Sequence, residues 1–393
     1  MGGGLMQLVA YGAQDIYLTG NPQITFFKVV YRRHTNFSME AIEQTWNGTS
    51  DGAAGRCTAT ISRNGDLVHR MYFEITAGDR GGSDADALNP GSRFINSVEL
   101  EIGGQKIDKH TGNWMETWAE LTEPNPSGAT YSCDTLDGAG GTLFQRMTGM
   151  GGVDPVNHVE ATQKFFVPLQ FWFCRNPGLA LPLIALQYHE VKVILDHDIL
   201  RFSNHASTSN KLWCDYIYLD TDERRRFAQV SHEYLIEQVQ EQTVTGLVNG
   251  ADLNFNHPVK ELVWIIADRV GLADATATPL QGTGYKLKLN GHDRFAARNF
   301  TYFTRVQVWE HHSGAGGLNC ANGAEQGKFN DSIGVYSFAL KPEEHQPSGT
   351  CNFSRIDNAQ LMSGATDAGA IVFAVNYNVL RIMSGMGGLA YSN

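Results

Sequence analysis

Short runs that alternate apolar and polar residues, separated by glycine turns, recur along the whole chain. Within residues 94–102, Val98, Leu100 and Ile102 alternate with Glu99 and Glu101, which is the period-two pattern of a strand with one buried face. The chain has 42 glycines and 12 prolines, so many tight turns are available between strands. This pattern predicts an all-β protein.

The candidate strands lie in both halves of the chain, whereas helical patterns are few. Besides residues 94–102, the candidate strands are residues 57–61, 67–75, 164–173, 191–195, 213–219, 259–267, 285–289, 302–309, 335–340 and 371–383. Helices are expected only at residues 113–121 and 220–229. In the second helix Asp220 can cap the first turn, with Glu223 three residues later.

The length of 393 residues suggests about two domains. The two halves also show a faint internal similarity. Residues 100–105 read LEIGGQ and residues 287–292 read LKLNGH, each a strand that runs into a glycine turn. Such a match is weak evidence of a repeat by itself.

Four segments spread over the chain carry a more specific signal. Residues 8–36 read LVAYGAQDIYLTGNPQITFFKVVYRRHTN, residues 61–66 ISRNGD, residues 177–190 PGLALPLIALQYHE and residues 376–391 NYNVLRIMSGMGGLAY. Together they resemble the major capsid proteins of large nucleocytoplasmic double-stranded DNA viruses, most of all the algal-virus (phycodnavirus) type.

The resemblance implies a fold of two tandem antiparallel eight-stranded jelly rolls (a double jelly roll) with a few short helices. On this basis we expect an N-terminal arm at 1–21, a first jelly roll at 22–219, a linker helix at 220–229 and a second jelly roll at 230–393. It also implies a structural protein of the virion capsid, made and assembled in the host cell cytoplasm. Its expected partners are two further copies in a homotrimer, neighbouring capsomers and minor capsid proteins on the inner face.

Motifs for catalysis or metal binding are not found. His189 and Glu190 are adjacent, so in a strand they point to opposite faces; His189 and His197 read as surface or rim histidines. The six cysteines contain no close pair of the kind that zinc sites need, and Cys174 and Cys214 read as small core residues. We therefore expect no catalytic residue, no metal and no cofactor.

The net charge of −11 disfavours direct contact with nucleic acid, because phosphate binding needs clustered lysine and arginine. The longest apolar run, residues 179–186, has eight residues. A membrane-spanning helix needs roughly 20, so no transmembrane segment is expected.

Two segments are candidates for assembly contacts. In the arm, apolar side chains are too numerous for a solvated tail and are expected to dock on the inner side of the shell; they include Leu5, Leu8, Tyr11 and Tyr17. In the linker helix, Arg224, Arg225 and Arg226 are expected to pair with acids where the jelly rolls meet. Possible glycosylation sites are the sequons at Asn47 and Asn299.

Two alternatives remain open at this point. A tandem jelly-roll glycan-cleaving enzyme would share the architecture and would require two acidic side chains close in space with perturbed pKa values. A carbohydrate-binding protein would use the abundant aromatic residues.

Overall fold

The computed structural model describes residues 6, 10, 12–78, 89–124, 142–152, 162–199, 209–266, 280, 282–317, 329–364 and 369–391. The chain separates into two units, Met1–Asn36 and Phe37–Asn393. The first unit carries the short helix α2 (Ile16–Thr19). All the labelled strands belong to the second unit.

The first half of the second unit contains two antiparallel sheets. One sheet has the order β1 (Phe37–Gln44), β10 (Ser209–Leu219), β4 (Leu67–Gly78) and β7 (Thr162–Pro168), with β8 (Leu181–Pro182) paired to β4. The other has the order β2 (Trp46–Gly48), β3 (Gly55–Thr60), β9 (Val191–His197), β5 (Ile95–Ile102) and β6 (Gln105–Thr111). Without the short strands β2 and β8, the chain order of the strands is 1-8-3-6 in one sheet and 2-7-4-5 in the other.

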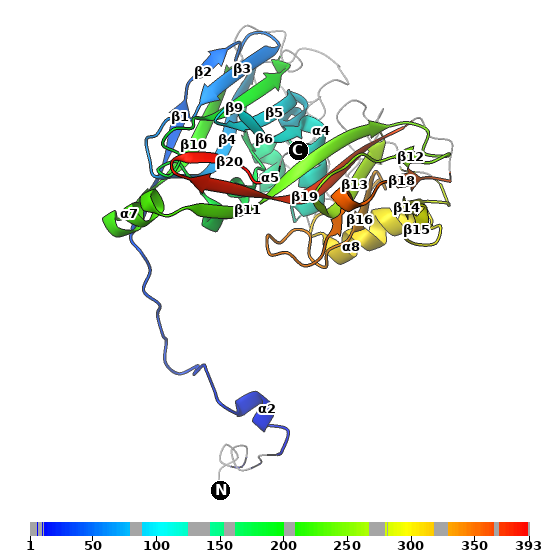
Figure 1. Ribbon diagram of the computed structural model, residues 1–393, viewed down its shortest axis with the longest axis horizontal. Helices are drawn as coiled ribbons and strands as arrows, with labels where there is room; N and C mark the ends of the chain where they lie inside the picture. The colour runs from blue at the N-terminus through cyan, green and yellow to red at the C-terminus, as the bar shows by residue number, and fades with distance from the viewer. Residues whose placement is uncertain are drawn as a thin grey trace. The chain divides into compact units, whose positions relative to one another are not determined.

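The second half repeats this arrangement. One sheet has the order β11 (His232–Val244), β19 (Ala370–Met383), β13 (Pro258–Ile266) and β16 (Ile333–Ser337), with β17 (Cys351–Asn352) on β13 and β20 (Met386–Leu389) on β19. The other has the order β12 (Ala251–Asp252), β18 (Ala359–Met362), β14 (Lys286–Leu289) and β15 (His292–Asp293). Without β17 and β20, the described strands again follow 1-8-3-6 and 2-7-4-5. Two sheets wound in this way form a jelly roll, so the predicted double jelly roll is confirmed (Figure 1).

Short helices connect the strands. They are α3 (Pro90–Arg93), α4 (Gly112–Thr122), α5 (Leu143–Thr148), α6 (Trp172–Arg175), α7 (Thr221–Gln229) and α8 (Gln307–His311), with 3₁₀ turns at Pro177–Leu179 and Phe353–Arg355. The predicted helices at 113–121 and 220–229 are confirmed as α4 and α7. The Asp220 carboxylate accepts a hydrogen bond from the Thr221 N–H, which caps α7 as expected.

Three predicted strands are wrong in part or in whole; one of them, predicted at 335–340, ends at Ser337 as β16. Residues 302–309 form a π-helical turn, Tyr302–Val306, that continues into α8, because Phe303 is fully buried in the core and Asp331 binds the turn. The strand predicted at 164–173 ends at Pro168, where proline offers no N–H to a neighbouring strand.

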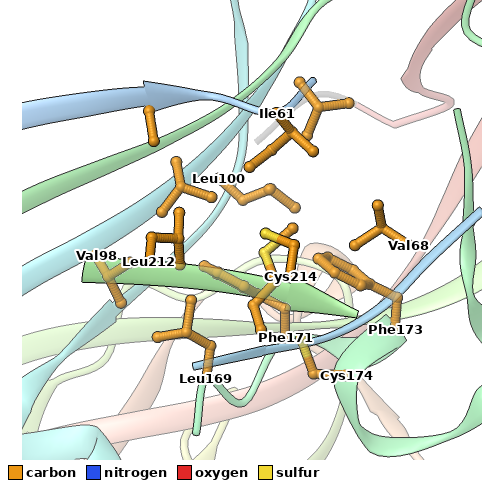
Figure 2. Close-up of a cluster of buried hydrophobic side chains, with 14 of the residues drawn as sticks. Ile61, Val68, Val98, Leu100, Leu169, Phe171, Phe173, Cys174, Leu212 and Cys214 are labelled. Carbon is orange, nitrogen blue, oxygen red and sulfur yellow. The ribbon is translucent and has the colours of Figure 1, made fainter. Parts of the chain in front are cut away.

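Each half has its own hydrophobic core. In the first, Ile61, Leu100 and Phe171 surround Cys214 (Figure 2). Burial raises the pKa of the neighbouring Cys174 thiol to about 12, so both cysteines act as small neutral core residues, as predicted. A second cluster around Trp264, Tyr285 and Phe303 fills the other half.

Candidate assembly interface

Helix α4 joins the two halves. It lies between β6 and β7 of the first half, and its Met115 and Ala119 pack into the first core. Its other face carries Trp114 and Trp118, which pack against β13, β16 and β19 of the second half. The rings of Trp114 and Phe373 are 5.1 Å apart between centroids. One amphipathic helix therefore contributes to two hydrophobic clusters.

This contact explains why β19 is apolar on both faces. Val372 and Ala374 point into the second core, whereas Ile371, Phe373 and Val375 point toward α4. Such a strand needs cover on both sides, and α4 supplies the second cover. The junction between the halves is therefore an extension of the hydrophobic core.

Buried charges cross the same junction. Glu237 of β11 lies 2.9 Å from Arg175 of α6 and 2.9 Å from Lys260 of β13. Burial alone would raise the pKa of Glu237, but Arg175 and Lys260 outweigh it and lower this pKa to about 2. Lys260 is fully buried, so its charge depends on nearby carboxylates for compensation, chiefly on Glu237 and less on Glu261.

A second set of charges lies around His312. Its Nε2 is 3.0 Å from Glu261 and its Nδ1 is 3.1 Å from Glu343. Burial opposes the charged imidazole, but the two carboxylates outweigh that effect and raise the pKa of His312 to about 9. Trp118 lies between the two sets: its ring is 5.0 Å from the Arg175 guanidinium and edge-on to His312 at 6.4 Å.

Backbone and side-chain hydrogen bonds complete the junction. The Val239 N–H of β11 donates to Asp108 Oδ1 of β6 at 3.1 Å. Thr111 Oγ1, also at the end of β6, donates to Glu241 Oε2 at 2.6 Å. Both strands lie at sheet edges, so each edge is partly covered by the other half.

Comparison with known proteins identifies the family of the chain. Residues 25–220 match a family model described as the major capsid protein N-terminus, and residues 223–388 match one described as the large eukaryotic DNA virus major capsid protein. The chain is 53% identical to the major capsid protein of Pyramimonas orientalis virus, over the full length of both proteins. The chain belongs to this capsid protein family.

Other relatives with sequence or structural similarity are also capsid proteins. The major capsid protein of Paramecium bursaria Chlorella virus 1 is 42% identical over the full length of both chains. A quasi-atomic model of the PBCV-1 virus capsid superposes with a TM-score of 0.77 at 36% identity, covering 94% of this chain and 100% of the other. The major capsid protein of Faustovirus, at 14% identity and a TM-score of 0.61, shares the fold.

Family membership settles the class of function. This is a structural protein of the virion capsid and not an enzyme, so the glycan-cleaving alternative is wrong. Within the described residues, no group of His, Cys, Asp or Glu side chains is placed to hold a metal ion. None of the helices in the described part of the chain is long and apolar enough to cross a membrane.

Two histidines considered as surface residues differ in position. His197 is fully buried, which corrects that prediction; its Nε2 lies 2.8 Å from the Thr49 carbonyl oxygen. His189 is half-buried, and its Nδ1 lies 2.9 Å from the Gly387 carbonyl oxygen near the C-terminal end of the capsid protein.

The three arginines of the linker helix differ in their ion-pair partners. Arg224 Nε lies 2.9 Å from Asp66 Oδ1, and Arg226 Nη1 lies 3.1 Å from Glu223 Oε1. Arg225 is exposed and has no ion-pair partner among the described residues. Together with Phe227, which packs on the first half, Arg224 ties α7 to that half.

The remaining candidate residues are either exposed or outside the described part of the capsid protein. Leu5, Leu8 and Tyr11 lie outside the described residues. Tyr17 belongs to α2, which buries no side chain. Asn47 and Asn299 are both exposed; whether they are glycosylated stays a prediction.

The two halves also meet at α4, outside the linker helix at 220–229 where the sequence predicts their contact. A signal for it was present. Trp114 and Trp118 are four residues apart, so they lie on one helix face, and residues 370–375 are apolar at successive positions. A helix with aromatic residues on one face and a strand that is apolar on both faces must each bury those residues against another element.

Proposed function

We propose that three copies of this capsid protein form a trimeric, pseudo-hexagonal capsomer of an icosahedral shell. The observation that carries the proposal is the repeated strand order, 1-8-3-6 and 2-7-4-5, in both halves. Two similar wedges per chain, taken three times around an axis, give six similar wedges. Such a unit can occupy a hexagonal lattice position.

In this proposal the chain is divided as the sequence suggests, with an arm at 1–21, jelly rolls at 22–219 and 230–393, and a linker helix at 220–229. The arm would dock on the inner face of the shell, on a neighbouring capsomer or a minor capsid protein. Assembly would take place in the host cell cytoplasm. With a net charge of −11, the protein would make no direct contact with nucleic acid.

The test is the mass of the purified full-length protein in solution, measured by light scattering after size-exclusion chromatography. One chain has a mass of 43.3 kDa, so a trimer would have three times that mass. Electron micrographs should then show particles with a hexagonal outline. A protein that stays monomeric over micromolar concentrations and forms no shells would contradict the proposal.

A further inference from the structure

Helices α4 and α8 occupy the same place in the internal repeat. In each half the helix lies between the fifth and the sixth principal strand: α4 follows β6 and precedes β7, and α8 follows β15 and precedes β16. The face of α4 that points away from its own core covers the outer face of the next jelly roll. By analogy, the outward face of α8 is a candidate to cover another jelly roll.

That face of α8 presents an exposed tryptophan. Val308 is buried in the junction cluster beside Trp114 and Trp118, whereas its neighbour Trp309 is 83% exposed. The helix is held by hydrogen bonds at its N-terminal end. Arg305 donates two hydrogen bonds to Asp331, of 2.8 and 2.6 Å, and the Ser337 N–H donates to Gln307 Oε1 at 3.0 Å.

Trp309 offers a large apolar ring to a partner from an ordered helix. Tryptophan is enriched among the few residues that dominate binding energy at protein interfaces. A support that is already ordered lowers the entropy lost on association.

A surface on which Trp309 could pack lies on the first jelly roll. The sheet β1-β10-β4-β7 corresponds strand by strand to β11-β19-β13-β16, the sheet that α4 covers. Its core-facing residues alternate with Tyr72, Phe166 and Trp213, which are half-buried on the outer face. Tyr72 pairs with Trp213 across β4 and β10, and the rings of Tyr72 and Phe166 are 6.2 Å apart.

The aromatic group on this sheet thus lies on the face that corresponds to the one where α4 contacts Phe373, Val375 and Val263. Charged side chains surround it; Glu74, for example, accepts a hydrogen bond from Trp213 Nε1 at 2.8 Å. Within one chain, the first jelly roll covers the second. On the outer sheet of the first jelly roll, Phe227 of α7 covers the end of β4 and β10 at Leu67 and Ile217, whereas Tyr72, Phe166 and Trp213 stay half-buried.

We propose that α8 covers this sheet in a second copy of the chain, with Trp309 of one copy packed on Tyr72, Phe166 and Trp213 of the next. The contact repeats between copies the contact that α4 makes within one chain. Its donor and acceptor surfaces differ, so three copies related by a three-fold rotation would close it into a ring. This inference rests on the proposed trimer and names the residues that would hold it.

The first experiment compares Trp309→Ala with Tyr188→Ala by light scattering over a dilution series of the full-length protein. Tyr188 is a matched control, since it is 75% exposed but lies outside the proposed contact. Loss of a dominant interface residue should weaken trimer association roughly 30-fold or more per contact. Tyr188→Ala should dissociate like the wild type, and circular dichroism should show both variants folded.

The second experiment detects the contact directly. The double variant Trp309→Cys and Phe166→Cys is oxidised and run on a denaturing gel without reductant, with each single variant as a control. Cross-linked chains only in the double variant support the contact. A trimeric wild type whose Trp309→Ala variant is equally stable, and whose double variant does not cross-link, refutes this inference and leaves the trimer intact. A monomeric wild type refutes the proposed function and this inference with it.

Discussion

The buried charge of Glu237 should make a large, pH-dependent contribution to stability. Replacing it by glutamine removes the negative charge between Arg175 and Lys260, both 2.9 Å away. Lys260 is fully buried and would lose its main counter-charge; breaking a buried ion pair typically costs about 3–5 kcal/mol. We therefore expect Glu237→Gln to lower the free energy of unfolding at pH 7 by that amount.

The sign of the pH dependence follows from the lowered pKa. The pKa of Glu237 falls from 4.5 to about 2 on folding, and each pKa unit corresponds to about 1.4 kcal/mol. The carboxylate thus contributes about 3 kcal/mol, which is fully present above pH 4.5 and is lost as the pH falls through 2. The gap between wild type and Glu237→Gln should shrink by that amount between pH 5 and pH 2.

Urea unfolding followed by tryptophan fluorescence, at a fixed protein concentration and several pH values, measures this gap. Glu233→Gln is the matched control, since Glu233 lies on the same strand and pairs with Arg381 in an exposed ion pair. Exposed pairs contribute at most about 1 kcal/mol. If both variants lost equal stability, or if the gap for Glu237→Gln persisted at pH 2, the reasoning about the buried network would be refuted.

Four further predictions concern the junction, the linker helix and the arm. Trp118→Ala should lower the free energy of unfolding by about 3–5 kcal/mol, because α4 would lose a buried ring against the second half; chemical unfolding measures it. The pKa of His312 is raised to about 9, so the folding stability that its charged imidazole contributes is complete below pH 6.5 and is lost as the pH rises through 9. The melting temperature of the wild type, but not that of His312→Gln, should fall over this range. Arg224→Ala should lower the melting temperature by leaving its buried aspartate partner unpaired, whereas Arg225→Ala should not. Removing residues 1–20 should leave a folded trimer that assembles poorly into shells, as electron microscopy can show; normal assembly would contradict a role for the arm.

Much of the fold could be predicted from alternation, because a strand with one buried face has a visible period of two. The strand predicted at 94–102 is β5 at Ile95–Ile102, and the one predicted at 371–383 is β19 at Ala370–Met383. The cap at Asp220 likewise has a local cause, a side chain that binds a free backbone N–H. Features with local causes could be predicted.

Features whose cause lies in the other half of the chain could not. Strand β11, His232–Val244, was not among the predicted strands, because Glu237 and Gln238 interrupt its alternation although both are buried. They are tolerated there since Arg175 and the Ile107 carbonyl oxygen, both from the first half, bind them. A sequence does not show which distant residues will compensate a buried charge.

The two outer sheets differ in a way that the order of assembly would explain. The sheet of the second half is covered by α4 of the same chain, so its outer face can be fully apolar, with Ile371, Phe373 and Val375 buried against the helix. The equivalent sheet of the first half would wait for another copy of the chain, and a large aliphatic face exposed in the meantime would promote aggregation. Its aromatic side chains are half-buried and stand beside ion pairs such as Glu74–Lys164. A surface of this kind is soluble when free and still offers aromatic anchors for binding, which is the combination that a subunit needs if it folds alone and assembles later.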